Sequence, residues 1–176
     1  MAHIEQRDFC LRIKAIHPKH FYNVNVLDVG SLDVNGSNRY LFTGSNSAIM
    51  GIDVVLGKNV DALSKGHEWS APDGFYDTII STECFEHDIY YELTLKNIVR
   101  MLKSGGMFIF TCATTGRKEH GIAVDFAIHP EWWGNYYKNL TAKDIRASID
   151  VDDIFKEYLF GVNDKSYDLY FYGIKK

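Results

Sequence analysis

Short, mostly apolar runs recur along this chain and are separated by turn-forming residues. They lie at residues 24–29, 47–53, 60–64, 75–81 and 107–112. Runs of this length and composition are typical of strands buried on both faces, as in a parallel sheet. Residues 88–102 instead place Tyr91, Leu95 and Ile98 on one face at helical spacing,. Strands that alternate with helices predict an α/β fold with a doubly wound, mostly parallel sheet.

The segments at both ends of this alternation also carry helical signals. Residues 3–16 show an imperfect helical pattern that Pro18 ends,, so we expect an N-terminal helix within residues 1–20. We expect this helix to cover a sheet face or the mouth of a site. Thr141, followed three residues later by Asp144, resembles a capping box and predicts a second helix near the C-terminus,. The whole chain, 1–176, is expected to form a single domain.

The last two apolar runs must pair differently from the others. Residues 155–161 and 167–174 are joined by only five residues, 162–166. A parallel crossover needs a dozen or more residues, so these two strands must be antiparallel.

The glycine-containing stretch 104–106 is expected to end the helix predicted over residues 88–102.

The connection 113–140 is about twice as long as compact domains usually tolerate. It is rich in charged and aromatic residues, among them Trp132, Trp133 and Tyr137. A connection of this kind is expected to form a lid or a substrate loop. The alternative is that its aromatic side chains fill a small core. A wall of these rings would suit a flat or sugar-like molecule.

Candidate chemistry lies where the first two strands end. The first strand runs directly into a turn at Gly30, and Ser37 or Asn38 is expected to cap a short helix after it,. Asp53 ends the second strand, about twenty residues after the glycine. The glycine allows close approach of a ligand, and the acid can bind a ribose diol. Asp28 interrupts the first strand, where it either accepts backbone N–H bonds or contacts a ligand cation.

Composition narrows the classes of partner. The net charge is −4, and no run of Lys or Arg tracks phosphates, so nucleic acid is an unlikely partner,. No apolar run approaches the roughly 18 residues of a membrane span. Three dispersed cysteines indicate free thiols and a cytoplasmic protein,. The seven histidines show no ligand spacing such as HxxxH, so no metal is expected,.

Four segments together resemble the class I S-adenosylmethionine-dependent methyltransferase superfamily. They are VLDVGSLDVNGS, the GID that ends at Asp53, FYDTIISTECFEH and LKSGGMFIFTC. The resemblance covers roughly residues 24–174. It implies a Rossmann-like sheet of seven strands with an antiparallel C-terminal strand, in three α/β/α layers. The first motif reads GSLDVNG instead of the commoner GxGxG, so only Gly30 matches clearly and Ser31 takes the next position.

The resemblance also implies roles for matching positions. Gly30 and Ser31 would lie under the methionine part of S-adenosyl-L-methionine, with Asp28 near its ammonium group. Asp53 would bind the ribose hydroxyls. The expected contacts to the adenine are Gly66 and His67, and those to the methionine and sulfonium end are Ser81 and Glu83.

The implied reaction is methyl transfer to a small-molecule or glycan-like acceptor, with S-adenosyl-L-homocysteine as product. A base helps where the acceptor is a hydroxyl, and the candidates are His120, His87 and Glu119. His87 has an alternative, purely structural role as a partner of the following helix. Two other functions stay open: a non-catalytic cofactor-binding partner protein, and a nicotinamide-dependent Rossmann enzyme, against which the missing GxGxxG argues. Exposed aromatic residues would also suit a homodimer.

Overall fold

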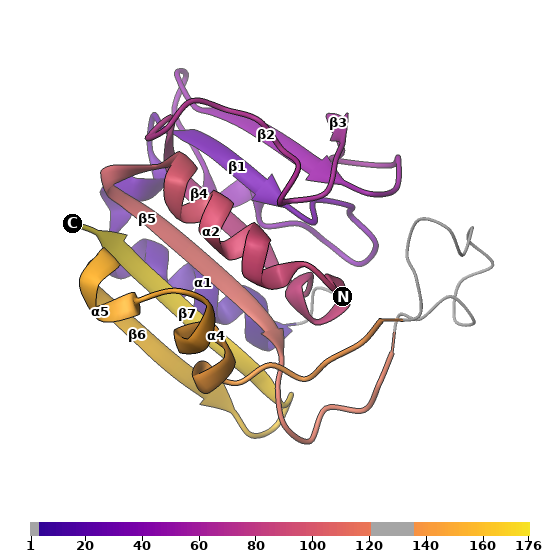
Figure 1. Cartoon of the computed structure of the whole chain (residues 1–176). Helices are drawn as coiled ribbons and strands as arrows, with labels where there is room; N and C mark the ends of the chain where they lie inside the picture. The colour runs from indigo at the N-terminus through magenta and orange to yellow at the C-terminus, as the bar shows by residue number, and fades with distance from the viewer. Residues whose placement is uncertain (1–3, 121–135) are drawn as a thin grey trace.

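The computed structural model describes residues 4–120 and 136–176 (Figure 1). Its strands form one seven-stranded sheet with the order β3-β2-β1-β4-β5-β7-β6. The strands are β1 (Asn25–Val29), β2 (Ala48–Asp53), β3 (Ala62–Leu63), β4 (Tyr76–Thr82), β5 (Leu102–Ala113), β6 (Phe155–Asn163) and β7 (Asp168–Lys175).

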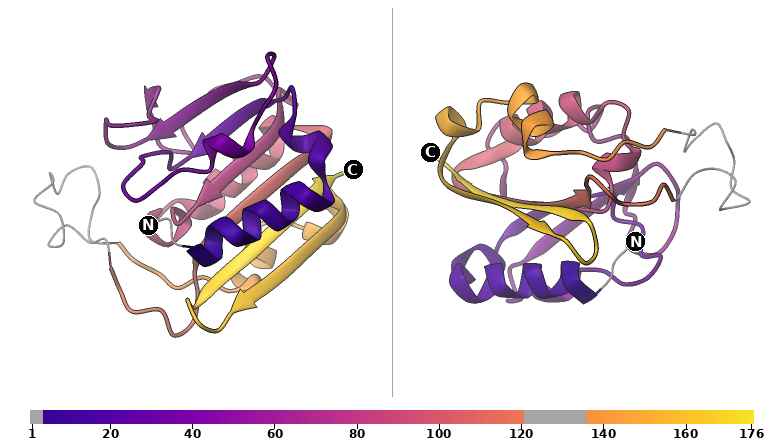
Figure 2. Two further views of the ribbon diagram at one scale, coloured as in Figure 1. Left: turned by 180° about the vertical axis from the view of Figure 1, so that it is seen from behind. Right: turned by 90° about the horizontal axis from the view of Figure 1, so that it is seen from below.

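Helices cover both faces of this sheet and make three layers (Figures 1 and 2). The α-helices are α1 (Ile4–Ile16), α2 (Tyr91–Met101), α4 (Ala142–Ser148) and α5 (Val151–Ile154). Three short 3₁₀ helices join them: η1 (Pro18–Phe21), η2 (Arg39–Leu41) and η3 (Phe85–His87). Figure 2 shows α1 on one face, while α2 and α4 lie on the other. None of the helices in the described ranges has the length and apolar character needed to cross a membrane.

The pairing of the strands confirms the predicted fold. Strand β1 pairs in parallel with β2 and β4, and β4 pairs in parallel with β5. Strand β7 lies between β5 and β6 and is antiparallel to both. Phe171 on β7 pairs with Phe110 on β5 and with Phe160 on β6. The chain therefore has the Rossmann-like sheet with one antiparallel C-terminal strand.

Alternation along the central strands fills two cores. Ile79 and Phe108 belong to the core beneath α2 and α4, and their neighbours Ile80 and Ile109 belong to the core beneath α1. Successive residues of a strand point to opposite faces, so a continuous apolar run supplies both cores at once. This explains why the buried strands read as unbroken apolar segments.

One predicted helix boundary was wrong, and one predicted short helix is present as a 3₁₀ helix. Helix α2 ends at Met101, and residues 104–106 lie inside β5, where the pairing with β4 is irregular between Tyr76 and Thr78. Gly105 has φ +75°, which suits an irregular strand as well as a helix end,. After the first strand, the predicted helix capped by Ser37 or Asn38 is only the 3₁₀ helix η2. There the Ser37 hydroxyl accepts the Arg39 N–H at 3.1 Å.

The predicted capping box at the start of α4 is confirmed. The Thr141 hydroxyl accepts the Asp144 N–H at 3.4 Å, and the Asp144 carboxylate accepts the Thr141 N–H at 2.9 Å. The segment predicted as a lid or substrate loop, 113–140, lies partly outside the described residues. Strand β5 extends to Ala113, and residues 121–135, which include Trp132 and Trp133, lie outside the described residues.

Candidate functional site

A cleft of about 200 Å³ opens at the carboxyl ends of β1, β2 and β4. This is the edge where ligands bind in open α/β sheets. The loop after β3, the residues before α2 and His120 complete its wall. The lining residues are Asp28, Val29, Gly30, Ser31, Leu32, Val34, Gly36, Ser37, Asn38, Asp53, Val54, Ser64, Lys65, Gly66, Thr82, Glu83, Cys84, His87, Asp88, Ile89, Tyr90 and His120.

Gly30 lies at the wall of the cleft, in a conformation and a space that favour glycine. Its φ is +78°, and a Cβ there would lie 2.6 Å from the Cβ and Sγ of Cys84. The N–H groups of Gly30 and Ser31 both donate to the Ile52 carbonyl, at 2.9 and 3.0 Å. The turn after β1 is thereby fixed to the end of β2. Ser31 is buried at the wall, and its hydroxyl has no hydrogen-bond partner within the described ranges.

Asp53 is held at the cleft wall by the backbone. Its two carboxylate oxygens accept the N–H groups of Leu32 at 3.0 Å and Val55 at 3.1 Å. Burial raises the pKa of Asp53, and these backbone donors oppose the rise. Each carboxylate oxygen has further acceptor capacity, which suits a pair of hydroxyl groups.

Asp28 is buried at the end of β1 beside the guanidinium group of Arg39. The Arg39 Nε lies 3.7 Å from its carboxylate, and the same guanidinium contacts Asp61 at 2.8 Å. Burial raises the pKa of Asp28 to about 7, although Arg39 opposes the rise. A second cation reaching Asp28 from the cleft would therefore stabilise its ionised form.

Glu83 leaves β4 in a strained conformation and faces the cleft. Its φ is +55°, in the left-handed region that non-glycine residues rarely occupy,. The Glu83 N–H donates to the Thr111 carbonyl at 2.8 Å, and its carboxylate accepts the Thr111 hydroxyl at 2.9 Å. Strain of this kind persists where the surrounding structure enforces it, often at functional sites.

Three of the residues singled out from the sequence do not line the cleft. The Ser81 hydroxyl is buried and donates to the Val29 carbonyl at 2.9 Å, which joins β4 to β1. The His67 ring packs on the Tyr90 ring at 4.5 Å, and Gly66 takes its place at the wall. Glu119 is exposed. The other predicted site residues come together around one opening.

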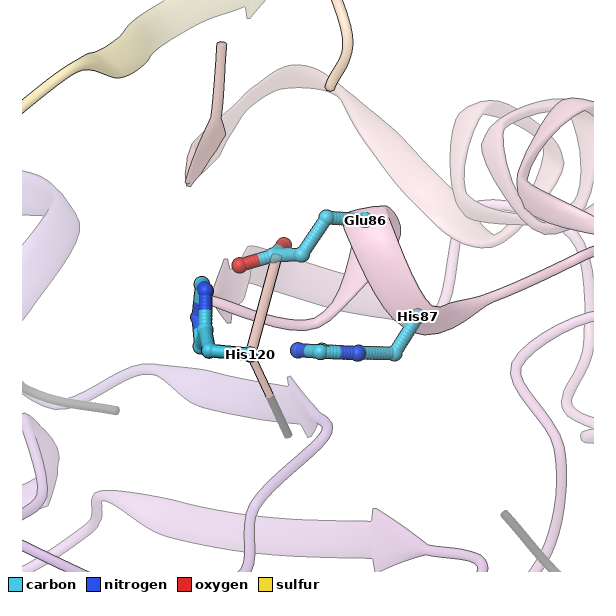
Figure 3. A group of neighbouring side chains, drawn as sticks. All are labelled: Glu86, His87 and His120. Carbon is cyan, nitrogen blue, oxygen red and sulfur yellow. The ribbon is translucent and has the colours of Figure 1, made fainter. Parts of the chain in front are cut away.

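At one end of the cleft, three rings lie in mutual contact. The ring centres of His87 and His120 are 5.4 Å apart, and Tyr137 lies 5.4 Å from His87 and 5.2 Å from His120. Burial lowers the pKa of His87 to about 3, so its ring is neutral near pH 7. Glu86, fully buried on η3, projects toward the two histidines (Figure 3). Burial and the nearby Glu83 carboxylate raise the pKa of Glu86, and backbone amides oppose this only in part.

Sequence reasoning missed Glu86 as well as Lys65, Ile89 and Tyr90 at the other end of the cleft. Tyr90 is 45% exposed and stands between His67 and the Lys65 ammonium group, which lies 5.7 Å from the ring centre. For Tyr90 the signal in the sequence was an aromatic residue at the start of a helix that follows the ligand edge. Glu86 lies within FYDTIISTECFEH, which was interpreted as a single family motif, so it was not considered on its own.

The family of the chain follows from comparison with known proteins. A family model described as a methyltransferase domain matches residues 1–137. This chain belongs to that methyltransferase family. Among curated proteins, none matches the sequence.

Solved structures share the fold at low sequence identity. The YcgJ protein of Bacillus subtilis is 13% identical with a TM-score of 0.64, and the match covers 99% of each chain. The 1,6-didemethyltoxoflavin-N1-methyltransferase of Burkholderia thailandensis, solved with bound 1,6-didemethyltoxoflavin and S-adenosylhomocysteine, is 14% identical with a TM-score of 0.60 over 98% of this chain and 83% of that one. The N-methyltransferase NodS of Bradyrhizobium japonicum is 17% identical, also at 0.60, over 97% and 94%. At these identities the likeness shows the fold alone.

Proposed function

We propose that this protein binds S-adenosyl-L-methionine in the cleft and transfers its methyl group to a small acceptor. The observation that carries the proposal is the convergence of three buried carboxyl groups, on Asp28, Asp53 and Glu83, around the turn at Gly30. They come from the ends of three neighbouring parallel strands, so the sheet itself fixes their spacing. Membership of the methyltransferase family supports the same ligand.

The chemistry of the cleft fits the charged and hydroxyl groups of this cofactor. The cofactor carries an ammonium group, a sulfonium and a ribose diol. Asp28 would hold the ammonium group, Asp53 the two ribose hydroxyls, and Glu83 would lie toward the sulfonium. Buried polar groups without a hydrogen-bond partner in the described ranges, on Ser31 and Asn38, also line the cleft. Such groups are costly unless a polar ligand or water completes them.

The charge of the cleft argues against a nicotinamide dinucleotide. Its lining contains four carboxyl groups, on Asp28, Asp53, Glu83 and Asp88, and the side chain of one lysine, Lys65. A dinucleotide would bring a doubly negative pyrophosphate into this acidic surrounding, at a cost in charge repulsion. A cationic cofactor gains from the same surrounding.

When bound, the cofactor supplies an electrophilic methyl group, and the protein has to align the acceptor with it. Reacting atoms must approach to about 3–3.5 Å in line. His87 and His120 line the end of the cleft beyond Glu83, so they are the described side chains that would face an acceptor there. The acceptor side of the reaction depends on these two histidines.

Binding of the cofactor separates the candidate functions. Thermal and urea unfolding would be measured with S-adenosylmethionine, S-adenosylhomocysteine and NAD in parallel. Ligand at 100 times its dissociation constant stabilises a protein by about 2.7 kcal/mol. We expect stabilisation by both adenosyl ligands. Stabilisation by NAD alone would overturn the proposal.

Catalysis needs a second measurement. Cofactor with a labelled methyl group would be incubated with the protein and a fractionated small-molecule extract, and label transfer to a new compound is expected. His120→Asn should reduce this transfer while leaving the affinity for S-adenosylhomocysteine unchanged. Binding of the cofactor without transfer to any fraction would favour the non-catalytic partner protein.

A further inference from the structure

Glu86, His87 and His120 bring one carboxylate and two imidazoles to a single point. One potential ligand atom from each residue lies within 4.8 Å of the other two. Figure 3 shows the Glu86 carboxylate and the His87 ring both directed toward His120. Glu86 and His87 are adjacent on η3, whereas His120 comes from the segment after β5. The absence of an HxxxH pattern therefore does not bear on this cluster, because its ligands come from two distant segments.

The hydrogen bonding of His120 leaves its Nε2 available as a metal ligand. Its Nδ1 lies 3.0 Å from the Lys118 carbonyl, which can only accept, so in the neutral ring Nδ1 carries the proton and Nε2 carries the lone pair,. Nε2 is buried and has no hydrogen-bond partner among the described residues. A ring nitrogen fixed by a backbone carbonyl on its other side is the usual arrangement of a metal-binding histidine. The Tyr137 hydroxyl donates to the same carbonyl at 3.3 Å and helps to hold it in place.

Glu86 is a fully buried carboxyl group beside the cleft, and a bound cation would stabilise its ionised form,. Its residue is 0% exposed, and its two carboxyl oxygens make no hydrogen bond of ordinary geometry within the described ranges. A buried carboxyl that backbone amides stabilise only in part is costly, and bound metal is one of the ways in which proteins compensate it,. The other two groups of the cluster are the imidazoles of His87 and His120, and imidazoles bind a divalent ion in their neutral form,.

The separation of the rings is close to that of two zinc ligands. Two imidazoles bound to one tetrahedral zinc, with Zn–N of 2.0–2.1 Å, place their ring centres about 5 Å apart. The observed separation is 5.4 Å at an interplanar angle of 89°. The ligand atoms, which now lie up to 4.8 Å apart, would have to close to about 3.4 Å,. Rotation of the side chains can supply a change of this size.

We propose that Glu86, His87 and His120 form a binding site for a zinc ion at the acceptor end of the cleft. Three protein ligands with an open position are typical of catalytic zinc sites, and closed structural sites use four. Glu86 lies behind the two histidines, and both histidines line the cleft, so the open position would face the cleft.

The role of the ion rests on the proposed function, although its binding does not. In a methyltransferase, a zinc ion here would polarise an acceptor hydroxyl or thiol and favour loss of its proton. The released proton would pass to solvent, the acceptor would form a bond to the methyl carbon, and the carbon–sulfur bond of the cofactor would break. No oxidant or reductant is needed. His120 would then act on the acceptor through the metal.

Direct metal binding tests the site without an acceptor. The full-length protein would be treated with EDTA, desalted and titrated with Zn²⁺ by calorimetry. We expect one zinc per chain, and His120→Asn and Glu86→Gln should each weaken its binding by at least about a hundredfold. The matched control is His17→Asn, which removes a histidine lying 3.1 Å from the Glu157 carboxylate, outside the cleft. It should retain wild-type affinity.

The outcomes separate the two proposals. Because Glu86 is buried, circular dichroism would be recorded for every variant, and the partly exposed His120 is decisive if the Glu86 variant fails to fold. Zinc affinity equal in the wild type and His120→Asn would overturn the metal site. S-adenosylhomocysteine binding would be measured on the same EDTA-treated protein. Cofactor binding without specific zinc binding would contradict only the metal site. Specific zinc binding without cofactor binding would contradict only the proposed methyl transfer.

Discussion

Gly30 and Cys84 are packed so closely that a single added carbon on Gly30 would lie 2.6 Å from both the Cβ and the Sγ of Cys84. This contact joins the turn after β1 to the segment after β4, and both segments line the cleft. The floor of the proposed cofactor site is therefore set by backbone-to-side-chain packing between two strand ends. Changes at position 30 should affect the fold and the ligand together.

Gly30→Ala is expected to destabilise the protein more than Gly105→Ala does. Both glycines have φ near +75°, at +78° and +75°, so both substitutions incur a similar conformational penalty. A Cβ at position 105 meets no atom within 4 Å, whereas that at position 30 meets Cys84. Overpacking of this kind costs about 1–3 kcal/mol. Urea unfolding would measure the difference, and equal losses would mean that Cys84 moves away without cost.

Asp53→Ala should weaken binding of S-adenosylhomocysteine while the fold remains. Hydrogen bonds to a charged group contribute about 1.5–3 kcal/mol, so the dissociation constant should rise about 10- to 100-fold. The control is Asp77→Ala, since Asp77 also accepts a backbone N–H, that of Asn25 at 2.8 Å, but does not line the cleft. Calorimetry would compare the two. If both variants bind as the wild type does, the ribose lies elsewhere.

Binding of the cofactor should become stronger as pH rises from 6 to about 7.5. The pKa of Asp28 is raised to about 7 without ligand, so near pH 6 most of the carboxyl is protonated. An ammonium group beside it favours the ionised form, and binding then releases a proton. Affinity should rise by up to about tenfold per pH unit below pH 7 and flatten above it.

Asp28→Asn provides the matched comparison for this pH dependence. The variant should bind more weakly at pH 7.5 and show a nearly flat profile. Without ligand, the stability of the fold should change with pH in the opposite direction. The pKa of Asp28 is higher in the folded chain, so its protonation stabilises the fold as pH falls. A wild-type profile parallel to that of the variant would show that Asp28 does not face the ammonium group.

The fold could be predicted from the sequence because burial on both faces leaves a direct signal. Ile79 and Ile80 serve opposite cores, and such a run has few interpretations other than a central strand. The helix boundary near Gly105 could not be predicted, because a positive φ serves a helix end and an irregular strand equally well. The choice was made by pairing between β4 and β5, which is a tertiary contact.

The residues of the candidate site at the strand ends could be predicted from the sequence. The contacts made by the segment after β5 could not. Asp28, Gly30 and Asp53 end adjacent strands, so topology alone places them together. The contact between His87 and His120 depends on the path of the chain after β5, which no local pattern encodes. A turn-forming histidine and a metal-binding histidine look the same in a sequence.

His20 should make the fold sensitive to acid. Its residue is 5% exposed, its Nε2 lacks a hydrogen-bond partner within the described ranges, and burial lowers its pKa from 6.5 to about 4. Between these two values the unfolded chain binds a proton that the folded chain does not. The stabilisation that neutral, buried His20 gives the fold is therefore fully present above pH 6.5 and is lost progressively as pH falls toward 4. The loss amounts to about 3 kcal/mol, since one pKa unit corresponds to about 1.4 kcal/mol.

His20→Gln should remove this part of the pH dependence. Urea unfolding would be measured for the wild type and the variant at pH 7, 5.5 and 4, and the two free energies of unfolding should converge as pH falls. Substitution at a buried position lowers stability at pH 7, so the decisive quantity is the change with pH and not the value at one pH. Two curves that remain parallel from pH 7 to 4 would show that His20 takes up its proton without unfolding, through rotation of its ring toward solvent.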